Sequence, residues 1–335
     1  MTLAVSSGTM SVRTSPTGGT SALEDLDQYR RELTGYCYRM LGSGFEAEDA
    51  VQETMVRAWK AFDRFEGRSA VRSWLYRIAT NVCLDMLRSR QRRARPMDLG
   101  PSGTAEASLG APLPEATWVQ PIPDDRVLPE DGDPAELAAA RETIRLAFVT
   151  ALQHLPARQR AVLILREVLK WRASEVAELL DTSVASVNSA LQRARATLAT
   201  RNTSVDTSPV ADADQEALVA RYVDAFERYD VSALVTLLRD DAIMSMPPFP
   251  LWLRGPAEIA RFFLGQGIGC QGSKLLATTA NGSPAFGSYK PAPDGTRRPW
   301  AIQVIEVSGD RIVGHHNFLG PELFPVFGFP DHLPG

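Results

Sequence analysis

The chain has 335 residues, of which 44% are apolar and 23% charged, and this balance is typical of a soluble globular protein with two or three compact units. It contains no run of about 18 apolar residues, which argues against a membrane-spanning helix, and its polar N-terminus lacks the apolar centre of a secretion signal. Three scattered cysteines argue against a disulfide framework or a zinc site. We therefore expect a cytoplasmic protein that needs no metal and no cofactor.

Charge is unevenly distributed along the chain. The net charge is −4, from 36 basic and 40 acidic residues, yet residues 57–95 contain eleven basic and three acidic residues, and residues 158–201 contain eight and four. Two basic blocks of this kind are candidates for contact with phosphates. Because phosphate contacts supply most non-specific affinity, a chain this acidic overall should bind free DNA weakly. The pattern favours a protein that meets DNA together with a larger partner.

The first block of the chain predicts helices. Residues 1–23 are small and polar, and we expect a disordered leader there, whereas residues 24–95 have helical periodicity. One amphipathic helix is predicted over 45–62 and a second over 70–90, separated by a turn at 65–69 whose Gly and Ser suit a helix end and a new N-cap. The apolar face of the first helix is expected to consist of Val51, Met55, Ala58, Trp59 and Phe62.

The middle of the chain has a different composition. Residues 96–134 are rich in Pro, Gly, Ser and Asp and predict a long, partly extended linker, in which Trp118, Val119 and Ile122 are candidates for docking onto a neighbouring domain. Residues 135–201 return to helical periodicity, with one helix expected from Ala135 to about His154 and another over 157–168.

The end of this block predicts a helix-turn-helix. A short apolar helix at 176–180 is followed by the turn 181–183, with Ser183 as N-cap, and by a helix whose apolar face would be Val184, Val187, Ala190, Leu191 and Ala194. The second helix of such a motif reads base edges in the major groove. The alternative is a helical hairpin that only packs. If the motif binds DNA, the exposed residues are Ala185, Ser186, Asn188, Ser189 and Gln192 for bases, and Arg193 and Arg195 for phosphates.

Two long strings resemble a known family. The string DAVQETMVRAWKAFDRFEGRSAVRSWLYRIATNVCLDMLRSR is similar to region 2 of the extracytoplasmic-function (ECF) sigma factors of the sigma-70 family, and LPARQRAVLILREVLKWRASEVAELLDTSVASVNSALQRARATL is similar to their region 4. The strings occur in the family's order, with a linker in place of region 3. The resemblance implies two helical sigma domains, at 24–95 and 135–201, and a function in promoter recognition with core RNA polymerase.

The resemblance also implies roles for individual residues. Asp49, Gln52 and Glu53 would contact the coiled coil of the polymerase β′ subunit, and Leu155 and Leu163 would rest on the β flap. The helix from Ser183 would read the −35 element of the promoter. Many relatives have a basic residue at the position of Ala190, so one phosphate contact is in question. The turn that contains Phe65, Arg68 and Ser69, together with Asn81, would hold a base flipped out of the −10 element. The phosphates of the opened strand would be held by Arg72, Arg77 and Arg88.

The C-terminal third follows a short linker at 202–211. Residues 212–335 predict helices and then strands, and the alternation in WAIQVIEV and RIVGHHNFL fits a half-buried antiparallel sheet. The order of elements and the run MPPFPLWLRG resemble SnoaL-like domains, which are cone-shaped α+β folds around a pocket. Enzymes among them use an Asp or a His as general base, for which the candidates are Asp224, Asp241, His315 and His316. Adjacent residues of a strand face opposite sides, so at most one of the two histidines faces inward. Trp252, Phe262, Phe263 and Trp300 are expected in the pocket wall or the core.

We therefore expect a mainly α protein with an added α+β domain that acts as a sigma factor and catalyses no reaction. The C-terminal domain would regulate it by packing against the sigma regions or the linker. The implied partners are core RNA polymerase and promoter DNA, and the sequence identifies no ligand or anti-sigma factor. One alternative is a helix-turn-helix regulator with a ligand-sensing domain, which would bind promoters without polymerase. Another is a SnoaL-like enzyme, whose turnover would depend on one inward Asp or His.

Overall fold

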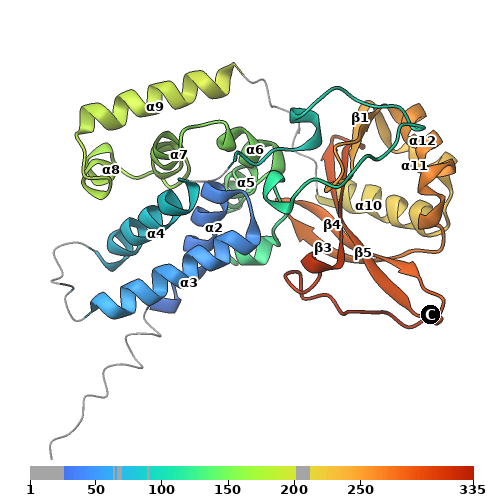
Figure 1. The fold of residues 1–335 in the computed structure, drawn as a ribbon, viewed down its shortest axis with the longest axis horizontal. Coiled ribbons are helices and arrows are strands. Elements are labelled where there is room, and N and C mark those ends of the chain that lie inside the picture. Colours follow the sequence, from blue (N-terminus) through green and yellow to red (C-terminus); the bar gives the residue numbers. More distant parts are fainter. Residues whose placement is uncertain (1–25, 63–64, 66–69, 89–90, 201–211) are drawn as a thin grey trace, which may run out of the picture.

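The computed structural model describes residues 26–62, 65, 70–88, 91–200 and 212–335, and the statements below refer to these residues. A helical half and a half built on a β-sheet lie side by side, and the segment after residue 90 runs along both (Figure 1). The predicted leader, the linker at 202–211, Arg68 and Ser69 lie outside the described residues.

Three helices form the first packed unit. Both helices predicted in this block are present, and the Ser43 side chain caps the first of them by accepting a hydrogen bond from the Glu46 N–H at 3.3 Å. Tyr36 and Tyr76 are fully buried between the helices, with ring centroids 5.2 Å apart. The helices are α2 (Arg30–Leu41), α3 (Gly44–Ala61) and α4 (Val71–Leu87).

The segment predicted as a linker is docked along much of its length. Trp118, Val119 and Ile122 have exposed fractions of 3%, 1% and 1%, so the prediction that they dock is confirmed. Backbone hydrogen bonds tie Ala94 to both Thr117 and Val119. The segment is therefore not a loose tether, because its apolar side chains fill the junction between the two halves. Its short 3₁₀ turns are η2 (Pro96–Asp98), η3 (Glu115–Thr117) and η4 (Asp124–Arg126).

The second helical unit ends in a helix-turn-helix. The single helix expected from Ala135 to His154 is wrong: two helices occur there, broken at Thr143. The break has a tertiary cause, since Arg39 of α2 donates hydrogen bonds to the Thr143 carbonyl at 3.2 Å and to its hydroxyl at 2.7 Å. The elements are α5 (Pro134–Glu142), α6 (Leu146–Gln153), α7 (Ala157–Leu163), the π-helical turn η5 (Ile164–Val168), α8 (Ala173–Leu179) and α9 (Val184–Ala199).

The C-terminal domain is a six-stranded sheet with three helices on one face (Figure 1). The strand order is β2-β1-β6-β5-β4-β3, in which β1 and β6 are parallel and the other neighbours are antiparallel. The helices are α10 (Asp212–Glu227), α11 (Val231–Thr236) and α12 (Pro256–Leu264). The strands are β1 (Leu238–Ser245), β2 (Trp252–Arg254), β3 (Lys274–Ala280), β4 (Ser283–Pro291), β5 (Arg297–Ser308) and β6 (Arg311–Leu319), after which come the turn η7 (Pro321–Leu323) and the chain end.

Both faces of the sheet are buried, so the expected half-buried sheet is wrong. On β5, Ile305 and Val307 pack in a core with α10–α12, whereas Ile302 and Val304 belong to one continuous core with the helical half. Alternation along a strand separates two faces, but only the neighbours decide whether the second face meets water. Here the helical half, the docked segment and Phe324 near the chain end cover it.

Three absences hold within the described ranges. No helix there is long and apolar enough to cross a membrane. No cluster of three or more His, Cys, Asp or Glu side chains there is arranged to hold a metal ion. All three cysteines are free thiols, with Cys37 and Cys83 buried and Cys270 partly buried.

Candidate polymerase and nucleic-acid interfaces

The outer face of α3 presents the residues predicted to contact polymerase. Asp49, Gln52 and Glu53 are all exposed, and Glu53 pairs with Arg57 at 2.6 Å. The buried face of α3 includes the small residues Ala47, Ala50 and Ala58, which let α3 lie close to its neighbours.

Trp59 lies on the exposed side of α3, and its predicted place in the core is wrong. Its exposed fraction is 56%, and Val56 beside it is 38% exposed. Gln52, Val56 and Trp59 are spaced by four and three residues, so they follow one helix face. Sequence reasoning missed the exposure of Val56 and Trp59, because the position of Trp59 matches the helical period of the buried residues.

Two of the arginines predicted to hold phosphates, Arg72 and Arg77 of α4, are engaged within the protein, whereas Arg88, just after α4, is mostly exposed. Arg72 pairs with Glu32 at 2.8 Å, and its guanidinium lies 5.3 Å from the ring of Tyr76 and 5.7 Å from that of Trp171. Arg77 lies 3.6 Å from the Glu178 carboxylate of α8. Arg88 is the most exposed of the three, with an exposed fraction of 80%. In this arrangement α8 therefore occupies part of the face through which α4 is expected to hold DNA.

Asn81 lies exposed on α4 at the junction of two grooves. One groove of about 560 Å³ runs between α4 and the start of α7, and the other, of about 550 Å³, runs between α4 and α8. Both are lined by Asn81, Leu84 and Arg158. Phe65 packs against Trp74 with their rings tilted and their centroids 4.8 Å apart, so this part of the predicted base pocket has an aromatic side.

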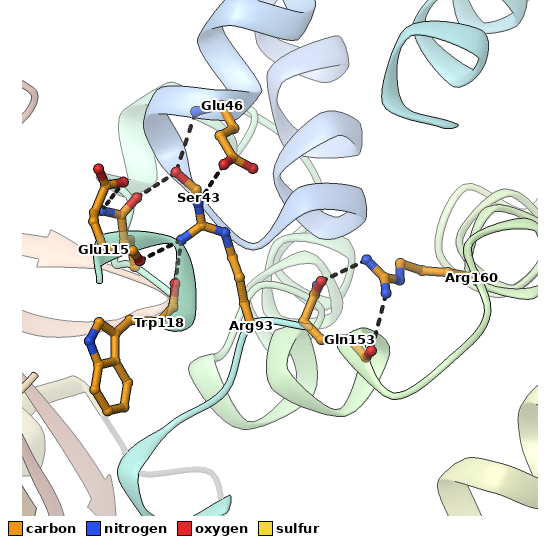
Figure 2. Close-up of polar contacts among 8 residues, drawn as sticks. Ser43, Glu46, Arg93, Glu115, Trp118, Gln153 and Arg160 are labelled. Atoms are coloured by element: carbon orange, nitrogen blue, oxygen red, sulfur yellow. Dashed lines mark hydrogen bonds and ion pairs between the residues drawn. The ribbon is translucent and has the colours of Figure 1, made fainter. Parts of the chain in front are cut away.

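The last arginines of the first basic block hold the docked segment. Arg93 is 4% exposed and donates hydrogen bonds to the carbonyls of Trp118 and Glu115 at 2.6 and 3.0 Å, while it pairs with Glu46 at 2.5 Å (Figure 2). A guanidinium with this many partners is unavailable to phosphates. The number of basic residues in this block of the sequence therefore overstates the positive charge that its surface can offer to phosphates.

The predicted recognition helix, α9, is open to solvent. Ser183 caps it by accepting a hydrogen bond from the Ser186 N–H at 3.1 Å, as predicted. Val184 is 43% exposed, so its place on the apolar face is wrong, because it lies in the first turn beyond the reach of α8. Arg195 pairs with Glu167 at 2.6 Å. The other predicted DNA-binding residues of this helix are all exposed: Ala185, Ser186, Asn188, Ser189, Gln192 and Arg193.

Leu155 and Leu163 lie inside the protein instead of on a flap-binding surface. Both have exposed fractions of 3% or less and belong to the core shared by the two helical units. The two leucines that the resemblance assigns to polymerase are thus buried in this arrangement.

The two histidines of β6 face opposite sides of the sheet, as predicted. His315 stacks on Phe263 under the helices and lies 3.0 Å from the Tyr222 hydroxyl, and burial lowers its pKa to about 3. His316 lies on the other face, 2.8 Å from Ser245 and 3.3 Å from Glu306. Asp224 and Asp241 are surface residues, with exposed fractions of 63% and 59%, and each pairs with an arginine. Trp300 is 39% exposed and not in the core, whereas Trp252, Phe262 and Phe263 are buried.

Comparison with known proteins agrees with this architecture. Family models match as Sigma-70 region 2 at residues 26–93, Sigma-70 region 4 at 145–198 and SnoaL-like domain at 219–315. The ECF RNA polymerase sigma factor SigG of Mycobacterium tuberculosis is 45% identical over 312 residues, which cover 92% of this chain and 83% of SigG. SigJ of the same species is 28% identical over 314 residues, which cover 90% and 93%. The crystal structure of SigJ has a TM-score of 0.58 at 24% identity and covers 92% of this chain and 99% of its own.

Two helical domains, an exposed helix-turn-helix and an added sheet domain define a sigma-70-type transcription factor with a SnoaL-like extension. The chain belongs to the ECF RNA polymerase sigma factors. The predicted family, the predicted fold class and the predicted function as a sigma factor are confirmed.

Proposed function

We propose that this sigma factor binds core RNA polymerase through the outer face of α3 in the cytoplasm. Exposed Asp49, Gln52 and Glu53 would meet the β′ coiled coil, and the exposed indole of Trp59 would add an apolar contact at the end of the same stripe. The single observation that supports this proposal is the exposed indole of Trp59 on the same side of α3 as exposed acidic and amide groups. Exposed tryptophans of this kind are frequent hot spots of protein interfaces.

We further propose that α9 reads the −35 element and that α4 with the preceding turn holds the opened −10 strand. The exposed Ser, Asn and Gln side chains of α9 support the first role. The contact between Phe65 and Trp74 and the exposed position of Asn81 support the second, with Arg68 and Ser69 as further predicted members.

Core binding and promoter opening test these roles separately. Glu53→Arg and Gln52→Ala should each weaken co-elution with core polymerase about tenfold while the circular dichroism spectrum stays unchanged. Asn81→Ala should reduce promoter opening more than it reduces core binding. Permanganate footprinting measures the opening. Equal losses in both assays would refute the base-pocket role. Promoter binding by the chain without polymerase would favour the helix-turn-helix regulator instead.

The C-terminal domain, we propose, regulates the sigma domains and catalyses no reaction. One face of its sheet shares a core with the helical half. Aromatic side chains fill the other side, where the space beside Phe226, Tyr229 and Phe263 is about 10 Å³, roughly enough for one water. The only predicted base on that side, His315, is hydrogen-bonded to Tyr222.

The shared core also decides how regulation can be tested. Deleting residues 212–335 would expose Ile122, Val119 and other apolar residues of the helical half, and the outcome would mix regulation with misfolding. Single substitutions in the contact between the domains avoid this ambiguity.

A further inference from the structure

A pocket of about 200 Å³ lies between the two sigma domains, beside the docked segment. It is lined by the ends of α2, α4 and α6, the starts of α3 and α7 and the turn η3, and no described residue of the C-terminal domain takes part. Pockets for drug-sized ligands have volumes of about 300–1,000 Å³, so this one suits a smaller molecule. Three of its lining residues are arginines: Arg92, Arg93 and Arg160.

Arg160 of α7 carries a buried positive charge. Its exposed fraction is 5%, and burial lowers the pKa of its guanidinium group to about 10. It donates four hydrogen bonds, all to oxygens of neutral groups: the Gln153 side chain at 2.6 Å (Figure 2) and the carbonyls of Met40, Gln153 and Leu155. Its remaining N–H, at Nε, is buried and has no acceptor within the described residues. A buried charge and a buried donor without partners are both costly, so this side chain lacks an anionic acceptor.

Arg92 adds a second positive charge at the same pocket. Its guanidinium group donates to Nδ1 of His154 at 2.7 Å, and in the described part of the chain it pairs with no carboxylate. Arg93 differs, because it pairs with Glu46 at 2.5 Å. Glu46 is the only acid among the described residues that line the pocket. Three arginines against one glutamate leave an excess of two positive charges, those of Arg92 and Arg160.

This excess of charge indicates the chemical class of a ligand. A phosphate group on a small molecule carries close to two negative charges at neutral pH and has several strong acceptor oxygens. Guanidinium groups match phosphate in geometry as well as in charge. A carboxylate carries one charge and would leave the other arginine unbalanced. Apolar side chains complete the pocket and would pack against the carbon atoms of the ligand: Leu41, Leu87 and Leu155.

We propose that the pocket lined by Arg92 and Arg160 binds the phosphate group of a small phosphorylated molecule. The Arg160 Nε–H and the Arg92 guanidinium group would donate to the phosphate oxygens, and the exposed amide of Gln91 is a further donor at the same pocket. The site is additional to the proposed polymerase contacts on α3 and base contacts on α9, because it shares no residue with them.

Calorimetric titration of the full-length chain, in a buffer free of phosphate and sulfate, tests the site directly. Inorganic phosphate and ethyl phosphate are the probes. Both should bind to saturation with one ion per chain, and ethyl phosphate should bind at least as tightly because the leucines accept its carbon atoms. Acetate should bind at least about tenfold more weakly, since it carries one charge. Bound phosphate should also raise the thermal midpoint, as any ligand specific for the folded chain does.

Two variants change the pocket while Arg160, which holds the junction through its hydrogen bonds, is kept. Arg92→Gln removes one charge at an exposed position and should weaken phosphate binding at least about tenfold. Ala116→Leu, on the exposed turn η3, leaves every charge in place but fills part of the pocket, and it should weaken binding by a similar factor. Unchanged binding in both variants would place the phosphate elsewhere and overturn the proposal.

The matched control is Arg158→Gln, which removes one charge from an exposed residue of α7 that lines other grooves. It should change phosphate binding less than about twofold, because salt screens charges outside the pocket. Equal weakening in all three variants would show only a general attraction to positive charge.

Three results with the wild-type chain would also contradict the proposal. No binding of either probe up to about 10 mM would remove the site. Acetate binding as tight as that of phosphate would refute the phosphate class, and binding of inorganic phosphate without ethyl phosphate would refute a phosphorylated molecule as the ligand. These measurements involve neither polymerase nor DNA, so they leave the proposed sigma function to its own tests.

Discussion

Charged side chains are buried at the junctions between the domains. Glu306 and His316 form a buried pair 3.3 Å apart on the sheet face that meets the helical half. Burial opposes ionisation of Glu306, but the charges of His316, Arg95 and Arg145 outweigh it and keep its pKa well below the ordinary range. Gly314 makes room for the pair, since a Cβ atom there would lie 2.8 Å from both side chains. Such groups are sensitive to any change of charge or shape.

Asp124 is the residue of this junction that should respond to pH. Burial raises the pKa of its carboxyl group from 3.8 to about 6, against the opposing hydrogen bond from Gly282. Because the folded pKa is the higher one, protonation stabilises the folded chain. The contribution is complete below about pH 4 and is lost as the pH rises through about 6.

We predict that Asp124→Asn raises the thermal midpoint at pH 7.5, because the amide still accepts from Gly282 and carries no buried charge. The corresponding gain in the free energy of unfolding should be at most about 3 kcal/mol. It should shrink as the pH falls to 5, where the wild-type carboxyl group is largely protonated. Calorimetry across this range measures it. Asp125→Asn, at the exposed neighbour, is the control and should follow the wild-type curve. A midpoint difference that is the same at both pH values would contradict the assignment.

The helices differ in how they expose their functional faces. The candidate base contacts of α9 are exposed, whereas part of the predicted DNA face of α4 lies against α8. α3 carries an exposed Trp59 with no ring partner among the described residues, although Trp74 on the next helix packs against Phe62 and Phe65. An exposed tryptophan on a well-packed helix is a candidate contact for a partner.

Replacing Trp59 by alanine should therefore affect binding and not folding. We expect the affinity for core polymerase to fall about tenfold or more, which is a common loss for a tryptophan hot spot. The free energy of unfolding should change by less than about 0.5 kcal/mol, as for a surface substitution. Titration of labelled chain with core polymerase gives the first quantity and urea unfolding the second. Lys60→Ala on the same helix serves as control, and a loss of stability in Trp59→Ala would show that the indole packs after all.

At the scale of the whole molecule, one hydrophobic core joins three parts that differ in sequence character. The sigma domains, the docked segment and one face of the sheet share it. In this arrangement, in which α4 touches α8, Leu155 and Leu163 are buried and Arg77 lies 3.6 Å from Glu178, so these residues of the predicted interfaces are engaged within the chain.

A covalent cross-link across this contact should suppress transcription. In a chain with Arg77→Cys, Glu178→Cys and Cys270→Ser, a flexible bis-maleimide cross-linker with an internal disulfide would hold α4 against α8. Run-off transcription should fall more than about tenfold relative to the same chain after the linker is reduced, since the two promoter elements are about 25 base pairs, or about 85 Å, apart. The comparison within one variant removes the direct effect of losing Arg77. The single-cysteine chains should show no response to reduction of the linker. Equal activity of the cross-linked and reduced double variant would show that the arrangement in which α4 touches α8 can initiate transcription.

Much of the fold was accessible from local patterns. The helices at 44–61 and 71–87, the cap at Ser183, the helix-turn-helix and the opposite orientation of His315 and His316 all follow from periods and caps that span a few residues. The candidate site was accessible only in part. Burial at Leu155, the exposure of Trp59 and the pairing of Arg72 with Glu32 depend on neighbours that lie far away along the chain.

The sequence alone determined the family and the order of its regions, and it predicted which helix faces DNA, because these are recorded in residue types and their spacing. Only the tertiary structure decided which apolar faces meet each other. A period of 3.6 or 2 marks an apolar face but not its partner. The contact of Asn281 with Tyr38 joins residues 243 positions apart, and no local pattern predicts it.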